Sequence, residues 1–409
     1  MTIATSATTA ATAAVRRAGT ALLLAAAGAV LSGCGFFSNS ADAAPQQQPL
    51  PMSCPGSGTA PLTLVVGAHA NSPQPELPPQ IRTLVHDAAL AGQDVQVELL
   101  DGAPTTVQDR HFSSNSQNSR IRQHDLDQFI ADTETAVAGL RPNAPEADFL
   151  TGLSVAGQHT PAGGTIVVLD SGVATAGPVS FKDQATFGVD PGEVSKYLLS
   201  QQLMPDLKGR AVVFVDLGQT AGPQPGFAQN VQTHISDLWS TIVKNAGASC
   251  QTSIQATHPQ ASVPTTVPVA VVKPQPAPPF NTCGTTTLGD DGLVGFVAGS
   301  PDFRDPAIAK TTLSSLAQLL AGHTQQVRLI GSVSSDGVTT DDHILSLSRA
   351  EAVKNMLVGL GVDPSRITTE GAGAVVGPGH VQDRTANGSL IPWAAERNRS
   401  VTVVLNCRS

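Results

Sequence analysis

The run Thr165-Ile166-Val167-Val168-Leu169, followed by Asp170-Ser171-Gly172, decides the fold of the larger part of the chain. Five consecutive apolar or β-branched residues indicate a strand buried on both faces, and the polar residues after them indicate a turn. Similar runs lie at 62–67, 95–100 and 211–217, and segments with helical spacing alternate with them at about 76–91, 122–140, 144–157, 191–203 and 227–246. This alternation predicts an α/β domain with a doubly wound parallel sheet.

Polar side chains follow the predicted strands at the point where each strand ends. These side chains belong to His69, Asn71, Asp101, Asp170 and Asp216. Parallel sheets bind ligands beyond the carboxyl ends of their strands, so the three aspartates are candidates for a crevice that holds a cation or a cationic group. The alternative is that they cap helices and shape turns. The loops after Asp170 and Asp216 are similar, because each continues into Thr-Ala-Gly-Pro, at 175–178 and 220–223.

The architecture predicted for this part resembles the von Willebrand type A domain. The metal motif of that family, Asp-x-Ser-x-Ser, is absent, and its place after the first strand reads Gly67-Ala68-His69-Ala70-Asn71-Ser72. The sequence also lacks a GxSxG elbow, a GxxxxGK[ST] loop and an HExxH pair. We therefore expect neither a catalytic function nor a cofactor.

The composition of the chain limits the classes of molecule that the protein can bind. The 409 residues are 41% hydrophobic, enough for two or three domains with real cores. The net charge is −9, from 23 basic and 32 acidic residues, and only 4% of the residues are aromatic. Such a chain has neither the basic surface nor the stacking platforms that nucleic acids require. A nucleic-acid partner is not expected.

The N-terminal segment has the organisation of an export signal. Arg16 and Arg17 precede the apolar run Ala21–Val30, which ends in Leu31-Ser32-Gly33-Cys34. That tetrad resembles the bacterial lipobox, which implies removal of residues 1–33 and a lipid on Cys34. The resemblance predicts an exported protein, anchored by lipid to the cell membrane and facing the cell wall. The alternative is an ordinary secretory cut after Ala43, which would release the protein.

Two segments without periodicity divide the exported chain. Residues 34–53 are rich in Ser, Ala, Gln and Pro and predict a tether, and residues 259–282 are Pro-rich and predict a semi-rigid spacer. The modules between and after them are 54–258 and 283–409.

The cysteines fit an oxidising compartment. Four of them allow three pairings. We expect Cys54 to pair with Cys250 and Cys283 with Cys407, because each pair brackets one module. A zinc site is the competing use, but the sequence has neither a CxxC pair nor clustered histidines.

The C-terminal module has the predicted order β-α-β-α-β-β. Strands are expected at 294–297, 326–331, 367–371 and 400–405. One helix begins at Asp305-Pro306 and ends before Gly322, and a second spans 345–360. The pattern predicts a small mixed sheet with helices on one face.

Short segments of this module carry a resemblance to a known family. They are Gly331–Gly337, Leu345-Ser346-Leu347-Ser348-Arg349-Ala350, Gly361-Val362, Arg366-Ile367, Glu370-Gly371-Ala372-Gly373 and Asn398-Arg399-Ser400-Val401. In order and spacing they resemble the OmpA-like peptidoglycan-binding domain, over most of 288–405. The resemblance implies noncovalent binding of the diaminopimelate side chain in the cell-wall stem peptide.

The resemblance also implies a set of binding residues. In the family, an Asp in a Gly-His-Thr-Asp turn and an Arg in Leu-Ser-x-x-Arg-Ala hold the charged groups of the ligand. Here Ser334 stands at the Asp position and Arg349 at the Arg position. Asp336, Asp341 and Asp342 lie on the same loop and could substitute for the missing carboxylate, and Arg399 is a further candidate. The alternatives are that Arg349 is solvated or paired with one of these aspartates, and that Arg399 only fixes the last strand.

Together these features predict a lipid-anchored envelope protein that binds peptidoglycan and links the membrane to the wall. Two alternatives assign the activity to the module at 54–258. It could be an envelope hydrolase, or a receptor for a cation or other solute.

Overall fold

The computed structural model describes residues 52–55, 58–255, 261–290, 294–321, 324–335, 339–374 and 380–406, which fall in one compact unit. The predicted signal peptide 1–33, the lipidation residue Cys34 and all but the end of the tether lie outside the described residues. Within the part of the chain that the structure describes, no helix has the length and apolar character needed to cross a membrane.

The first module is built on a six-stranded sheet in the order β3-β2-β1-β4-β5-β6. Its strands are β1 (Leu62–Gly67), β2 (Asp94–Leu100), β3 (Thr105–His111), β4 (Thr165–Leu169), β5 (Ala211–Val215) and β6 (Cys250–Ile254). All neighbouring pairs are parallel except β2 with β3. The predicted parallel sheet is therefore confirmed. The sequence pattern indicated neither of its edge strands, the antiparallel β3 and the parallel β6.

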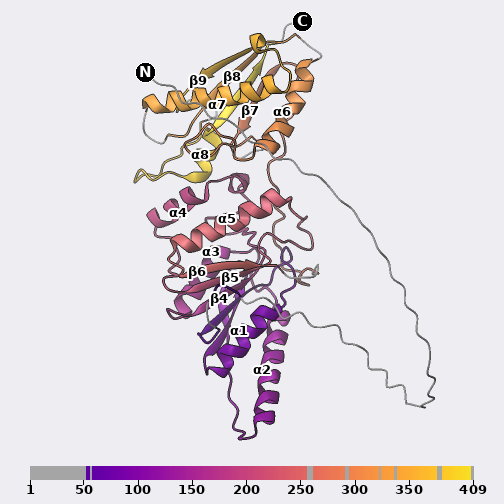
Figure 1. Cartoon of the computed structure of the whole chain (residues 1–409), viewed down its shortest axis with the longest axis vertical. Helices are drawn as coiled ribbons and strands as arrows, with labels where there is room; N and C mark the ends of the chain where they lie inside the picture. The colour runs from indigo at the N-terminus through magenta and orange to yellow at the C-terminus, as the bar shows by residue number, and fades with distance from the viewer. Residues whose placement is uncertain are drawn as a thin grey trace, which may run out of the picture. The chain divides into compact units, whose positions relative to one another are not determined.

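Helices cover both faces of this sheet. They are α1 (Pro79–Leu90), α2 (Ser119–Gly139), α3 (Phe149–His159), α4 (Pro191–Ser200) and α5 (Gln229–Asn245), with a short 3-10 turn, η1, at Gln184–Phe187. One apolar core lies between the sheet and α1 and α2, and the other lies between the sheet and α3, α4 and α5. Alternate strand residues such as Val167 and Val168 point into opposite cores, so each strand must be apolar throughout. Figure 1 shows these elements in colours from indigo through magenta to pink.

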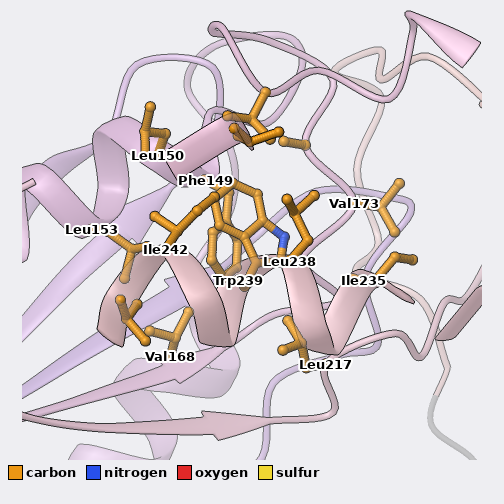
Figure 2. Packing of buried hydrophobic residues seen from close by; sticks show 14 of the residues in the cluster. Phe149, Leu150, Leu153, Val168, Val173, Leu217, Ile235, Leu238, Trp239 and Ile242 are labelled. Atoms are coloured by element: carbon orange, nitrogen blue, oxygen red, sulfur yellow. The ribbon is translucent and has the colours of Figure 1, made fainter. Parts of the chain in front are cut away.

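Trp239 is the centre of the second core. Its ring lies 4.3 Å from that of Phe149, among apolar residues of α3 and α5, as Figure 2 shows. The indole Nε1 donates a hydrogen bond to the carbonyl oxygen of Gly172, at 2.7 Å. The core therefore also fixes the loop that follows β4, where Gly172 has a positive φ of 73°.

The C-terminal module has a four-stranded sheet in the order β7-β10-β8-β9. Its elements are β7 (Gly284–Gly289), α6 (Pro306–Ala321), β8 (Val327–Ser332), α7 (Thr339–Gly359), the 3-10 turn η2 (Pro364–Arg366), β9 (Ile367–Gly371), α8 (Pro392–Asn398) and β10 (Ser400–Leu405). β8 and β9 are parallel, and β10 is antiparallel to both β7 and β8. Apolar residues of α6 and α7 form the core with this sheet, which confirms the predicted mixed sheet with helices on it (Figure 1).

One strand of this module was predicted at the wrong place. The sequence pattern indicated a strand at 294–297, but the first strand is β7, at Gly284–Gly289. Phe296 makes only an isolated bridge with Phe303, and their rings stack at 5.1 Å. β7 is a mostly exposed, threonine-rich edge strand, so it lacks the apolar alternation by which strands are recognised.

The disulfide expected in the first module is present. Cys54 and Cys250 are joined across 196 residues of sequence, and the bond ties the segment before β1 to the start of β6. Cys283 is disulfide-bonded as well, and Cys407 lies outside the described residues. Leu405 lies opposite Gly284, the residue after Cys283, in the β7–β10 pair. Pairing of Cys283 with Cys407 stays a prediction.

Candidate ligand site of the C-terminal module

Arg349 lies in α7 and is almost completely buried, at 1% exposure. Its Nε donates to the carbonyl oxygen of Ser300 at 3.1 Å, and Nη2 donates to that of Val297 at 3.4 Å. The guanidinium also lies 5.1 Å from the ring centroid of Phe296. Arg349 is therefore not a solvated helix residue, because the loop 296–300 covers it.

Ser334 follows β8 and is also buried, at 1% exposure. Its hydroxyl accepts a hydrogen bond from Nε of Arg399, at 3.1 Å. The structure thus brings together two of the residues that the sequence assigned to the site. Arg399 immediately precedes β10, so the prediction that it fixes the last strand describes only part of what this side chain does.

The other two nitrogens of Arg399 bind a carboxylate of the first module. Nη1 donates to Oε2 of Glu193 at 2.8 Å, and Nη2 donates to Oε1 at 2.6 Å. Glu193 lies in the first turn of α4, and Arg399 is 3% exposed. Two parallel hydrogen bonds between a guanidinium and a carboxylate are the strongest arrangement that this pair can make.

A second group of buried charges surrounds Glu396 of α8, which is fully buried. Arg304 lies 3.6 Å from Glu396 and 3.5 Å from Asp290, and Nη1 of Arg399 lies 3.7 Å from Glu396. Burial raises the pKa of Glu396 well above its usual value, and the negative charge of Asp290 raises it further. Burial alone would lower the pKa of Arg304, but the carboxylates of Glu396 and Asp290 outweigh it and raise that pKa.

Asp383 binds the residue next to Ser334, and no sequence motif predicted this contact. Its carboxylate accepts hydrogen bonds from the backbone amide of Ser335 at 2.8 Å, from the Ser335 hydroxyl, and from Nδ2 of Asn398 at 2.8 Å. Burial acts to raise the pKa of Asp383, but these hydrogen bonds dominate and lower it. Since Asp383 is 48 residues from Ser335 in an irregular segment, neither spacing nor periodicity could have revealed it.

The aspartates considered as substitutes for the missing family carboxylate are placed differently. Asp336 lies outside the described residues. Asp341 is exposed and Asp342 is half-buried, and both lie in the first turn of α7. At this position the positive end of the helix dipole stabilises their negative charges.

The strand ends of the first module carry the other predicted site. The sheet order places its switch point between β1 and β4, and His69 and Asp170 meet there, with Nε2 and Oδ2 2.7 Å apart. Asp170 and Asp216 line one crevice with Ser72 and Glu76, but its volume is only about 10 Å³, roughly one water molecule.

Asp101 does not line that crevice. Its carboxylate accepts hydrogen bonds from the backbone amides of Ala103, Asn143 and Ala144, at 2.8 to 2.9 Å. Among the described side chains, no group of three or more His, Cys, Asp or Glu residues is arranged to hold a metal ion. The arrangement favours the alternative that these aspartates shape turns, and cation binding by Asp101, Asp170 and Asp216 stays a prediction.

The described part of the predicted spacer, from residue 261, lies against these same strand ends. The backbone amide of Gln74 donates to the carbonyl oxygen of Ala261 at 2.6 Å, and Nδ2 of Asn71 donates to that of Ala270, also at 2.6 Å. Val263 and Val272 are buried. Residues 261–272 therefore pack on the first module, and Val272 belongs to the same apolar core as Trp239.

Comparison with known proteins concerns the C-terminal module. Residues 296–388 match the model of the OmpA family. None of the curated proteins matches the chain.

Three similar solved structures are the periplasmic domain of MotB from Helicobacter pylori, the peptidoglycan-associated lipoprotein from Burkholderia pseudomallei and the cell wall anchor of the type VI secretion system from Pseudomonas aeruginosa. The MotB domain is 13% identical, with a TM-score of 0.26, over 31% of this chain and 76% of its own. The lipoprotein is 25% identical, with a TM-score of 0.21, over 26% and 83%. The anchor is 23% identical, with a TM-score of 0.25, over 30% and 81%.

The segment that matches the family contains Ser334, Arg349 and Asp383, and Arg399 follows it, immediately before β10. The C-terminal module of this chain is an OmpA-like domain.

Proposed function

We propose that the protein is an exported envelope lipoprotein whose OmpA-like module binds peptidoglycan noncovalently, through the diaminopimelate of the stem peptide. The observation that carries the proposal is the OmpA family match over residues 296–388, with Arg349 at the position that the family uses for the ligand. The role is binding and structural, and involves no catalysis. A lipid on Cys34 would make the protein a link between membrane and wall.

The chemistry of the ligand fits the charges of this module. The side chain of diaminopimelate ends in an ammonium and a carboxylate. A guanidinium can hold the carboxylate by two parallel hydrogen bonds, and Arg349 and Arg399 are the candidates for this role among the arginines of the module. The ammonium needs acceptors, and Ser334 offers a neutral hydroxyl where the family has a carboxylate.

The affinity should therefore be lower than in family members that keep the aspartate. Losing one charge-assisted hydrogen bond costs about 1.5–3 kcal/mol, which is roughly a ten- to hundredfold loss of affinity.

Cosedimentation of the full chain with purified sacculi tests the proposal. The protein should sediment with sacculi that contain diaminopimelate, and Arg349→Ala should abolish this. Arg328→Ala is the matched control, because Arg328 lies in β8 of the same module and its side chain is 56% exposed, paired with Glu370 at 3.7 Å. Equal sedimentation of both variants with the unmodified chain would refute the assigned site, and no sedimentation of the unmodified chain would refute the function.

The anchor is tested separately. Metabolic labelling with a fatty acid should mark the unmodified protein and not Cys34→Ala. A mature N-terminus at Ala44 would contradict the anchor and would leave wall binding untouched.

A further inference from the structure

The two modules meet at the residues to which the proposed function assigns ligand binding. Besides the paired hydrogen bonds from Arg399 to Glu193, the backbone amide of Asp190 donates to Oε1 of Glu396, at 3.2 Å. The rings of Tyr197 and Trp393 meet edge to face, with centroids 5.3 Å apart. On one side these contacts come from α4 and its N-cap, and on the other from α8 and the residue after it.

We propose that α4 of the first module competes with the wall ligand, and that Glu193 occupies the place of the ligand's carboxylate on Arg399. This inference rests on the proposed function. A carboxylate held by both Nη1 and Nη2 of a guanidinium has the geometry in which an arginine binds a carboxylate ligand. Glu193 is thus an internal ligand, supplied by the same chain.

Burial makes the competition necessary. Ser334 and Arg349 are each 1% exposed and Arg399 is 3% exposed. A stem peptide cannot reach Nη1 and Nη2 of Arg399 while Glu193 occupies them. The first module must therefore withdraw α4 before Arg399 binds a ligand from solution, so the described arrangement is the closed state at Arg399.

Arg399 can exchange the carboxylate of Glu193 for that of the wall ligand. The wall ligand carries its own carboxylate, so Arg399 keeps an anionic partner when Glu193 leaves, and no buried charge is left unpaired. Glu193 itself keeps 14% of its side chain exposed and can be hydrated when released. The apparent affinity for the ligand is then the intrinsic affinity reduced by the fraction of open molecules.

Two variants release α4 by different means and keep the ligand-binding residues. Glu193→Gln keeps the shape of the side chain and removes its charge. Tyr197→Ala removes the contact with Trp393 and leaves every charge in place. Asp206→Asn is the matched control for charge, because its side chain lies on the same module, is 82% exposed and has Arg210 as its ion partner, at 3.9 Å.

The experiment is a calorimetric titration of the full chain and each variant with a muropeptide that contains diaminopimelate. Glu193→Gln and Tyr197→Ala should each bind at least tenfold more tightly than the unmodified chain, and Asp206→Asn should bind equally. Hydrogen exchange at the backbone amides of α8 provides an independent measure of opening. Exchange should rise in both release variants, and it should also rise in the unmodified chain when ligand is added.

The outcomes separate this inference from the proposed function. If the unmodified chain binds and the release variants bind no more tightly, the competition is refuted and the function stands. If Glu193→Gln binds more weakly, Glu193 belongs to the ligand site and the competition is also refuted. If exchange shows that the release variants are open and none of them binds, the proposed function is refuted, and the competition with it.

Discussion

Glu193 and Arg399 are 206 residues apart in sequence and form a paired ion contact between the two modules, with Oε1 and Nη2 2.6 Å apart. Arg399 links this contact to Ser334 through its third nitrogen. The turn at which the OmpA-like module would meet its ligand is thus connected directly to α4 of the α/β module. Any force or ligand that moves one module changes the surroundings of the other.

Close packing of α7 on β8 depends on Gly331. A Cβ atom at this position would lie 1.8 Å from the carbonyl oxygen of Ser346, which is backbone and cannot move aside. Gly331→Ala should therefore lower the free energy of unfolding by about 3 kcal/mol, the upper end for overpacked cores. Urea denaturation followed by circular dichroism measures this change.

Gly359, the last residue of α7, is the matched control. A Cβ atom there meets nothing within 4 Å. Gly359→Ala should leave the stability unchanged or raise it by up to about 1 kcal/mol, because alanine favours the helix. Equal effects of the two alanine substitutions would show that α7 does not pack on β8 as described.

The disulfide between Cys54 and Cys250 closes a long loop. In the chain-entropy account, a bond across 196 residues stabilises the folded state by about 5 kcal/mol. The double variant Cys54→Ala with Cys250→Ala should therefore unfold at a much lower urea concentration. Peptide mapping without reduction checks the pairing itself and should also find Cys283 joined to Cys407. A peptide that joins Cys250 to Cys283 would contradict the expectation that each disulfide lies within one module.

His234 of α5 should make the stability depend on pH. Its Nε2 donates to the carbonyl oxygen of Thr186 at 2.9 Å, and burial lowers the pKa of this imidazole from 6.5 to about 4. The unfolded chain then binds a proton at a pH at which the folded chain does not, so stability falls as the pH falls from above 6.5 toward 4. Between pH 7 and pH 5 this group should account for a loss of about 2 kcal/mol.

His234→Gln should remove that part of the loss, while other groups still titrate. Unfolding midpoints in urea at pH 7 and pH 5 test this, with the difference between the two proteins as the readout. If the difference in unfolding midpoint between the two proteins is the same at pH 7 and pH 5, the pKa of this imidazole is not lowered in the folded state.

The strands that the sequence predicted best are those with the strongest local pattern. β4, at Thr165–Leu169, and β10, at Ser400–Leu405, coincide with their predicted limits because β-branched residues fill both and polar residues end them. β3 escaped prediction because the segment Thr105–His111 is polar and largely exposed at the edge of the sheet. The helix predicted at 144–157 begins only at Phe149, because Asp148 is its N-cap and accepts from the amide of Thr151.

Only those site residues that belong to local sequence motifs could be predicted. The family pattern placed Ser334, Arg349 and Arg399, and the structure joins the first and the last of these. Asp383 and Glu193 carry no motif, and each meets its partner through contacts between distant segments. The burial of Arg349 beneath residues 296–300 also depends on tertiary packing, since helical spacing alone does not place a charged residue in a core.

The most direct test of the account compares two muropeptides in calorimetric titrations with the full chain, one with diaminopimelate and one with lysine at the same position. Lysine lacks the second carboxylate, so it loses the hydrogen bonds from the guanidinium groups, and its affinity should be about ten- to a hundredfold lower. Arg349→Ala should abolish that preference. Equal affinities for the two muropeptides would contradict recognition of the diaminopimelate carboxylate by this module, and a preference that survives Arg349→Ala would contradict its recognition by Arg349.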